Sequence, residues 1–220
     1  MIDINSNQLP IIILANCRTG STALGSYLAK TLAVPFFSEP FNTNNILNPD
    51  KNKLNFISFY TKKNNKFVLK FMPTSITDFT PYDEIMSHSG FKIKLLRKDV
   101  VAQLSSLYIA SCLDIYHKNT PKVVSDFQVP ICKDKIIDAI NVVLRNEFLL
   151  KRLSYKYNMT LFYEDLGIIQ NAEYFPSDKP TNMEEIKEEI RKILRWRWSS
   201  LKEHLVQSER FELSTPTTSR

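Results

Sequence analysis

Glycine and cysteine are scarce in this chain of 220 residues, which holds 4 glycines and 3 cysteines. A chain with so few glycines is expected to keep them where the backbone needs their conformational freedom. Cys17, Cys112 and Cys132 lack metal-ligand spacing, and an odd, sparse set fits a reducing compartment without a disulfide framework. We therefore expect a cytoplasmic protein with no cysteine-based metal site.

Long apolar runs are missing as well. No segment approaches the ~18–20 apolar residues that a membrane-spanning helix needs. The first residues lack the basic region of a signal peptide, and the apolar run from Leu9 to Ala15 is short and contains a proline. We expect neither a signal peptide nor a transmembrane segment, so any contact with a membrane would depend on something outside this sequence.

Acidic residues are also fewer than basic ones. The formal net charge is +6 at pH 7, which fits either solvated lysines on helices or an anionic ligand. The basic residues are dispersed, without a long Lys/Arg run and with little aromatic interleaving. This distribution argues against a nucleic-acid partner.

What the sequence does contain is an alternation of short apolar runs and helical patterns. Five runs are typical of buried strands: Ile11–Ala15, Pro35–Phe37, Phe67–Phe71, Ile93–Leu96 and Thr160–Tyr163. Apolar residues at helical spacing cover Gly20–Leu32, Asp99–Ile115, Asp134–Tyr157 and Met183–Val206. The alternation predicts an α/β fold with a mainly parallel sheet covered on both faces.

The chain shows no internal repeat and no linker, so we expect one domain, residues 1–207. Asn42–Asn65 is rich in Asn and Lys and is expected to hold an irregular helix and a loop. Gln170–Asn182 is expected to be a long loop, and the polar tail 208–220 is expected to be disordered.

The first strand pattern leads directly into a loop that suits an anion, Arg18-Thr19-Gly20-Ser21-Thr22. At the start of a helix, free N–H groups and the helix dipole favour negative charge. Ser21 and Thr22 can add hydroxyl donors, and Arg18 can fork onto phosphate or sulfate oxygens. The alternative, that the hydroxyls only cap the helix, leaves Arg18 and Gly20 unexplained.

This loop departs from the nucleoside-triphosphate motif G-x-x-x-x-G-K-[ST] at two positions. With Gly20 aligned to the second glycine, Ala15 replaces the first glycine and Ser21 replaces the lysine. An ordinary ATP or GTP enzyme is therefore a poor fit, and we expect a smaller anionic group at the loop.

A second anion-binding signal follows a later strand pattern. Arg97 comes after Ile93–Leu96, at the edge where open α/β sheets bind ligands, and Asp99 is a natural helix N-cap. Ser105 and Ser106 lie two turns into that helix, so Arg97 and one of the serines could share an anion.

Together these motifs resemble those of the sulfotransferases that use 3′-phosphoadenosine 5′-phosphosulfate (PAPS). That family has a 5′-phosphosulfate loop, [RK]-[ST]-G-[ST]-[ST], to which Arg18–Thr22 is similar. It also has an Arg followed eight residues later by a Ser for the 3′-phosphate, as Arg97 and Ser105 stand here. Leu161–Leu166, LFYEDL, is similar to the family's late Y-E-D/E-L segment, so three motifs occur in the family's order.

The resemblance implies a three-layer α/β/α P-loop-type fold, PAPS as sulfonate donor, no metal, and a hydroxyl acceptor such as a sugar or glycolipid. It assigns the donor nucleotide to Arg18, Thr19, Gly20, Ser21, Thr22, Arg97 and Ser105. Arg18 would also stabilise the leaving phosphate. The soluble branch of the family has a glycine-rich R-K-G segment that is missing here, and Lys179 is the nearest stand-in.

For the base that accepts the proton of the acceptor hydroxyl, the sequence favours Glu39. Glu39 follows the second strand pattern and so lies at the same sheet edge as Arg18. Its segment is similar to the G-E-P type of some bacterial sulfotransferases, with Ser38 in place of glycine. The alternative is that Glu39 is a solvated loop carboxylate. His88 and His117 are rival bases, but His88 precedes a strand pattern, at the wrong end of the sheet, and His117 lies past the end of the helix that begins near Asp99.

Three further charged residues lie within or just after strand patterns. Lys70, inside an apolar run, either snorkels or meets an anion, which would place it in the acceptor pocket. Glu164 and Asp165 could face the site, and the resemblance implies for them a structural role, in holding loops or the 3′-phosphate segment.

Two other functions stay open from the sequence. One is a non-catalytic nucleotide-binding protein that keeps Arg97 and Ser105. The other is an atypical P-loop kinase, against which the missing loop lysine counts.

Overall fold

The computed structural model describes residues 4, 6–40, 66–73, 90–113, 127–152, 157–167 and 180–197. The expectations for Asn42–Asn65 and for the tail 208–220 fall outside these ranges, as does most of the loop expected at Gln170–Asn182. Within these ranges, no helix has the length and apolar character needed to cross a membrane.

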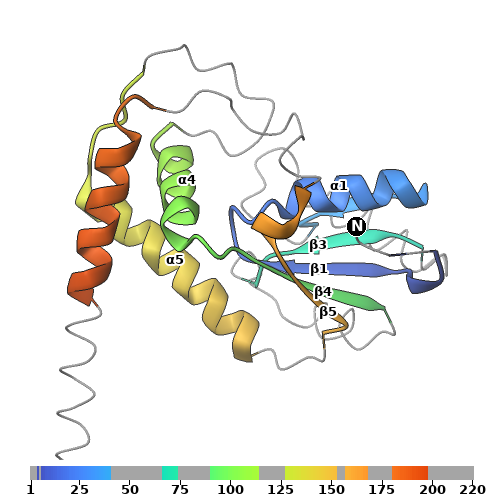
Figure 1. The fold of residues 1–220 in the computed structure, drawn as a ribbon. Coiled ribbons are helices and arrows are strands. Elements are labelled where there is room, and N and C mark those ends of the chain that lie inside the picture. The colour runs from blue at the N-terminus through green and yellow to red at the C-terminus, as the bar shows by residue number, and fades with distance from the viewer. Residues whose placement is uncertain are drawn as a thin grey trace, which may run out of the picture.

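A five-stranded sheet forms the centre of the molecule (Figure 1). After a short 3-10 helix, η1 (Ser6–Gln8), the strands are β1 (Ile11–Ala15), β2 (Phe36–Ser38), β3 (Val68–Phe71), β4 (Phe91–Leu96) and β5 (Met159–Phe162). Their order is β2-β3-β1-β4-β5, and every neighbouring pair is parallel. The predicted α/β fold with a central parallel sheet is confirmed.

Strand β1 lies in the middle of the sheet because it is apolar throughout. All of its side chains are fully buried, as expected for a parallel strand covered on both faces. Ile11 and Ile13 share a core with Leu28 of helix α1 (Ser21–Leu32). A central strand, a short loop and a helix in this order give the P-loop-type arrangement.

Three helices form a second core next to the carboxyl ends of the strands. They are α4 (Val100–Leu113), α5 (Lys133–Arg152) and a helix at residues 183–197. Figure 1 shows them grouped at the left, with α5 on the side of the sheet opposite α1, which completes the three layers. Their apolar faces meet around Leu104, Leu107, Ile136, Ile140, Ile186 and Ile190, and Cys17 joins this cluster.

Several predicted boundaries are wrong. Strand β2 is Phe36–Ser38 rather than Pro35–Phe37, and β4 begins at Phe91, two residues before the predicted Ile93. The helix expected to reach Tyr157 ends at Arg152, because Tyr157 lies at the entrance to β5, with its ring 5.4 Å from the Nζ of Lys94. The strand expected to include Tyr163 stops one residue earlier, since Tyr163 begins the 3-10 helix η3 (Tyr163–Asp165).

Candidate functional site at the carboxyl edge of the sheet

The side chains selected from the sequence meet at the carboxyl edge of the sheet, around the first turn of α1. The loop at residues 16–20 enters from β1, Glu39 follows β2, Lys70 lies in β3 and Arg97 follows β4. Open parallel sheets bind ligands at this edge. The contacts fall into two groups, one on the α4 side of the α1 N-terminus and one on the β3 side.

Two residues with left-handed backbone turn the loop into α1. Arg18 has φ 57° and Gly20 has φ 74°, and Gly20 is the N-cap of α1. No side chain caps this helix, so the capping alternative for Ser21 and Thr22 is wrong. Gly20 instead presents backbone at the helix start, the arrangement that binds anions elsewhere.

Buried polar contacts fix the loop from beneath. Thr19 is fully buried and donates its hydroxyl to the Asn16 carbonyl oxygen at 2.8 Å. The Asn16 amide donates to the Val143 carbonyl oxygen in α5 at 3.0 Å, and its Oδ1 accepts the N–H of Cys17. Burial raises the pKa of the Cys17 thiol to about 12, so Cys17 packs rather than reacts.

On the α4 side, the two segments predicted to bind anions are in direct contact. Arg97 donates from Nη1 to the carbonyl oxygen of Arg18 at 3.0 Å, and Arg18 donates from Nε to Ser106 Oγ at 2.9 Å. Gln103, buried in α4, donates to the carbonyl oxygen of Cys17 at 2.6 Å. The end of β4 and the helix α4 therefore hold the loop in place.

Arg97 carries a buried donor that its surroundings do not satisfy. Among the described residues, its Nε has no hydrogen-bond partner, and it forms only a long ion pair, 3.8 Å, with Glu164 Oε1. The ring of Tyr163 lies 4.5 Å from Cζ of the guanidinium. An unsatisfied buried donor costs free energy, which an anionic ligand oxygen would recover.

Glu164 and Asp165 hold the start of α4. Glu164 accepts the N–H groups of Lys98 at 2.9 Å and Asp99 at 3.1 Å, and Asp165 pairs with Lys98 Nζ at 2.7 Å. Burial by itself would raise the pKa of Glu164, but these backbone hydrogen bonds and the charge of Arg97 hold it below its ordinary value. The structural role expected for both residues is confirmed.

Ser105 lies deeper than its neighbour. Its side chain is buried, and its hydroxyl donates to the Val101 carbonyl oxygen within α4 at 2.7 Å. To donate to a ligand, Ser105 would have to exchange that bond. Ser106 is the serine that contacts an arginine of the site.

On the β3 side, Lys70 links two residues around the first turn of α1. Its Nζ lies 2.5 Å from Glu39 Oε1 and donates to Thr22 Oγ1 at 2.9 Å. The side chains of Lys70 and Glu39 are each only 10% exposed. Glu39 has φ 51°, a conformation uncommon for a non-glycine residue and frequent at functional sites.

Three residues considered for the site lie outside the part of the chain that the structure describes. They are His88 and His117, the rivals of Glu39, and Lys179, the stand-in for the R-K-G segment. The described ranges contain no group of three or more His, Cys, Asp or Glu that could hold a metal ion.

Sequence reasoning missed Asn16 and Gln103 and named Ser106 only as an alternative to Ser105. Gln103 shares the buried face of α4 with Leu107, and Asn16 directly follows a wholly apolar strand. An amide at an apolar position is the signal that could have marked both as buried hydrogen-bonding residues.

No protein-family model matches the chain, and no curated protein matches it. Among solved structures, the chain is similar to an uncharacterized protein from Eubacterium ventriosum ATCC 27560, with 12% identity, 70% of this chain and 88% of that chain covered, and a TM-score of 0.37. It is also similar to shikimate kinase from Bacteroides thetaiotaomicron, with 18% identity, 84% and 98% covered, and a TM-score of 0.38. Likenesses this weak carry nothing about function.

Proposed function

We propose that the protein is a sulfotransferase that moves the sulfonate of PAPS to a hydroxyl acceptor. The observation that carries this proposal is the hydrogen bond from Arg97 to the carbonyl oxygen of Arg18, which joins segments 79 positions apart. These are the two segments that resemble the family's 3′-phosphate and 5′-phosphosulfate motifs. A nucleotide with anionic groups on both its 3′ and 5′ oxygens needs two such cations on neighbouring segments.

The residues around α1 suit such a nucleotide. Gly20 opens α1 with backbone at its N-terminus, where phosphate oxygens are favoured. The buried Nε of Arg97 has no hydrogen-bond partner among the described residues, so an anionic oxygen would satisfy it. We assign the 5′-phosphosulfate to the loop with Arg18, Ser21 and Thr22, and the 3′-phosphate to Arg97. Ser105 is the expected hydroxyl for the 3′-phosphate.

Glu39 would accept the proton of the acceptor hydroxyl. Its carboxylate lies against Lys70, whose ammonium also contacts Thr22, so a base and a cation stand together at the first turn of α1. PAPS would bring the sulfonate and a stable leaving phosphate, while the chain supplies the base, the positioning and the compensating charge. Lys70 would line the junction between donor and acceptor.

The acceptor class rests on the resemblance. Loops that carry Arg at the position of Arg18 are typical of the carbohydrate-, protein- and lipid-directed and bacterial branches. We therefore infer a sugar or glycolipid hydroxyl as the acceptor.

One contact favours a second candidate, an atypical P-loop kinase. Ser21 replaces the loop lysine, but Lys70 brings an ammonium to the first turn of α1 from β3. With that charge restored, the same edge would also suit ATP. A nucleotide-binding protein without catalysis would need only the α4 side of the site.

A thermal-shift panel separates these functions. We expect adenosine 3′,5′-bisphosphate to raise the melting temperature without magnesium, and AMP to do so much less because it lacks the 3′-phosphate. At 100-fold saturation, mass action stabilises the fold by about 2.7 kcal/mol. A shift with ATP that requires magnesium would support the kinase, and equal shifts with the bisphosphate and AMP would contradict PAPS. A screen of hydroxyl acceptors with PAPS that carries a labelled sulfonate then separates an enzyme from a binding protein.

A further inference from the structure

Helix α5 exposes large apolar side chains on the face that points away from its core. Leu144 is 48% exposed and Phe148 is 60% exposed. They are four residues apart, which places both on one face of the helix. Ile137, seven residues before Leu144, lies on the same side but is partly buried against the helical core. The buried side of the same helix is already occupied by the shared helical core.

A surface hollow of about 450 Å³ continues this face between α5 and the helix at 183–197. Its lining is Lys133, Ile137, Glu189, Lys192, Ile193 and Trp196. Trp196 is 65% exposed, although tryptophan is usually well covered. Lys133 and Lys192 each lie 3.6 Å from Glu189, and Arg197 donates to Asn141 at 2.9 Å, so polar contacts join the two helices next to the hollow.

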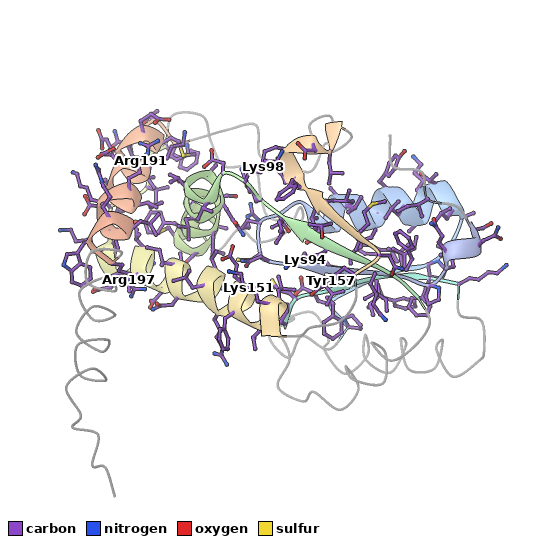
Figure 2. The ribbon with its side chains drawn as sticks, turned by 60° about the horizontal axis from the view of Figure 1, so that its bottom comes forward. Lys94, Lys98, Lys151, Tyr157, Arg191 and Arg197 are labelled. Atoms are coloured by element: carbon purple, nitrogen blue, oxygen red, sulfur yellow. The ribbon has the colours of Figure 1, made fainter. Side chains whose placement is uncertain are left out.

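Charge is distributed unevenly along both helices. In the helix at 183–197, four glutamates occupy residues 184–189, and four basic residues occupy 191–197. In α5, Lys133 and Lys135 balance Asp134 and Asp138 in the first half, whereas the second half carries three basic residues against a single acid, Glu147. The exposed apolar side chains lie in these basic halves. Figure 2, which brings this side of the molecule forward, shows Lys151 and Arg197 near the ends of the two helices.

We propose that this face, defined as Leu144, Phe148 and Trp196 with Arg145 and Lys151, seats the protein on an anionic lipid bilayer. Trp, Phe and Leu enter the interface between headgroups and acyl chains, while Lys and Arg attract anionic headgroups. A nucleic acid would use the basic residues but would give no burial to Leu144 and Phe148, so the combination favours a bilayer. The contact is peripheral, in keeping with the lack of a spanning helix in the described ranges.

This face shares no residue with the sheet edge, so the inference stands whether or not the chain transfers sulfonate. If it does, the bilayer would bring lipid-linked acceptors close to the protein.

Vesicle co-sedimentation of the full chain tests the inference. We expect binding to vesicles of equimolar phosphatidylcholine and phosphatidylglycerol, and none to phosphatidylcholine alone. Arg145→Ala with Lys151→Ala should weaken binding about 25-fold, since each positive charge near the surface contributes about fivefold. The matched control, Lys30→Ala with Lys66→Ala, removes the same charge from other elements and should bind like the wild type.

Phe148→Ser should weaken binding about tenfold without any change in charge, because it removes apolar surface from the interface. The chain has 2 tryptophans, so Trp198→Phe leaves Trp196 as the sole reporter, and its emission should move to shorter wavelength with the anionic vesicles. Unchanged emission, or equal losses in the test and control double variants, would overturn the inference. Two other results would also overturn the inference. One is that the protein binds no vesicles and forms a dimer that Phe148→Ser dissociates. The other is that the protein binds an oligonucleotide but not vesicles.

Discussion

The two sides of the α1 N-terminus differ in how far their charged side chains bond to main chain, although the α4 side also has contacts between side chains, such as Arg18 with Ser106. On the α4 side, charged side chains bond to main chain: Arg97 to the carbonyl oxygen of Arg18, and Glu164 to the N–H groups that start α4. On the β3 side, the charged groups contact each other: the side chains of Lys70 and Glu39 form an ion pair, beside a main-chain hydrogen bond from the Glu39 N–H to the Lys70 carbonyl oxygen at 3.2 Å.

A side chain that bonds to main chain fixes the shape of the backbone, whereas an ion pair between side chains can exchange partners by rotation alone. The α4 side is therefore suited to recognise a nucleotide with a preformed surface. The β3 side is suited to chemistry, because Glu39 and Lys70 can move a proton or a charge without a backbone change.

The largest effect is expected for Glu39→Gln on the β3 side. The variant keeps the shape of the side chain but removes the proton acceptor, so the rate of sulfate transfer should fall by about 10²–10⁴. The affinity for adenosine 3′,5′-bisphosphate, measured by calorimetry, should stay the same. Transfer within a few-fold of wild type would show that Glu39 is not the base, and loss of nucleotide binding would show that it holds the loop instead.

Lys70→Met should lower the free energy of unfolding by about 3 kcal/mol, because it removes the ammonium that lies 2.5 Å from the mostly buried carboxylate of Glu39. Urea denaturation measures this loss. The double variant Lys70→Met with Glu39→Gln removes both charges and should recover most of the stability. A double variant no more stable than Lys70→Met would show that the ion pair does not organise this side.

The two serines on α4 should differ in what they affect. Ser105→Ala should weaken the bisphosphate relative to AMP by about 1 kcal/mol if its hydroxyl reaches the 3′-phosphate. Ser106→Ala should weaken the binding of both nucleotides alike, because it removes a hydrogen bond that orients the side chain of Arg18. Isothermal calorimetry on the two variants distinguishes these outcomes, and the reverse pattern would move the 3′-phosphate contact to Ser106.

The smallest effect concerns pH and the α4 side. The folded pKa of Glu164 lies below its ordinary value of 4.5, so its contribution to stability is complete above that pH and is lost as the pH falls through the folded pKa. Glu164→Gln should therefore flatten the dependence of unfolding free energy on pH below about 4.5 and lower stability at neutral pH. Urea denaturation at a series of pH values measures this dependence. If the unfolding free energy of the variant falls at acid pH as it does in the wild type, Glu164 does not stabilise the fold in this way.

The fold was largely predictable from local pattern. Ile11–Ala15 is a strand with the predicted bounds because five consecutive apolar residues before a turn leave little choice. The order of the strands in the sheet could not be predicted from local pattern, because it depends on contacts between distant segments. The end of α5 was missed for the same reason: Tyr157 looks helical by spacing, yet it contacts Lys94 on β4 and lies two residues before β5 begins at Met159.

The basic residues of the site could be predicted from the sequence, but the residues that they contact could not. Arg18, Arg97 and Lys70 stood out because they follow or interrupt apolar strands. That Lys70 would pair with Glu39 and contact Thr22 could not be read from the sequence, because three separate elements set those distances.

The most direct test of the proposed function is calorimetry of two nucleotides on two proteins. Adenosine 3′,5′-bisphosphate and AMP are each titrated into the wild type and into Arg97→Ala. If Arg97 recognises the 3′-phosphate, the variant loses about 1.5–3 kcal/mol of bisphosphate affinity and almost no AMP affinity. If both nucleotides weaken equally, Arg97 only supports the loop through the Arg18 carbonyl, and PAPS is not the ligand that this edge was built to bind.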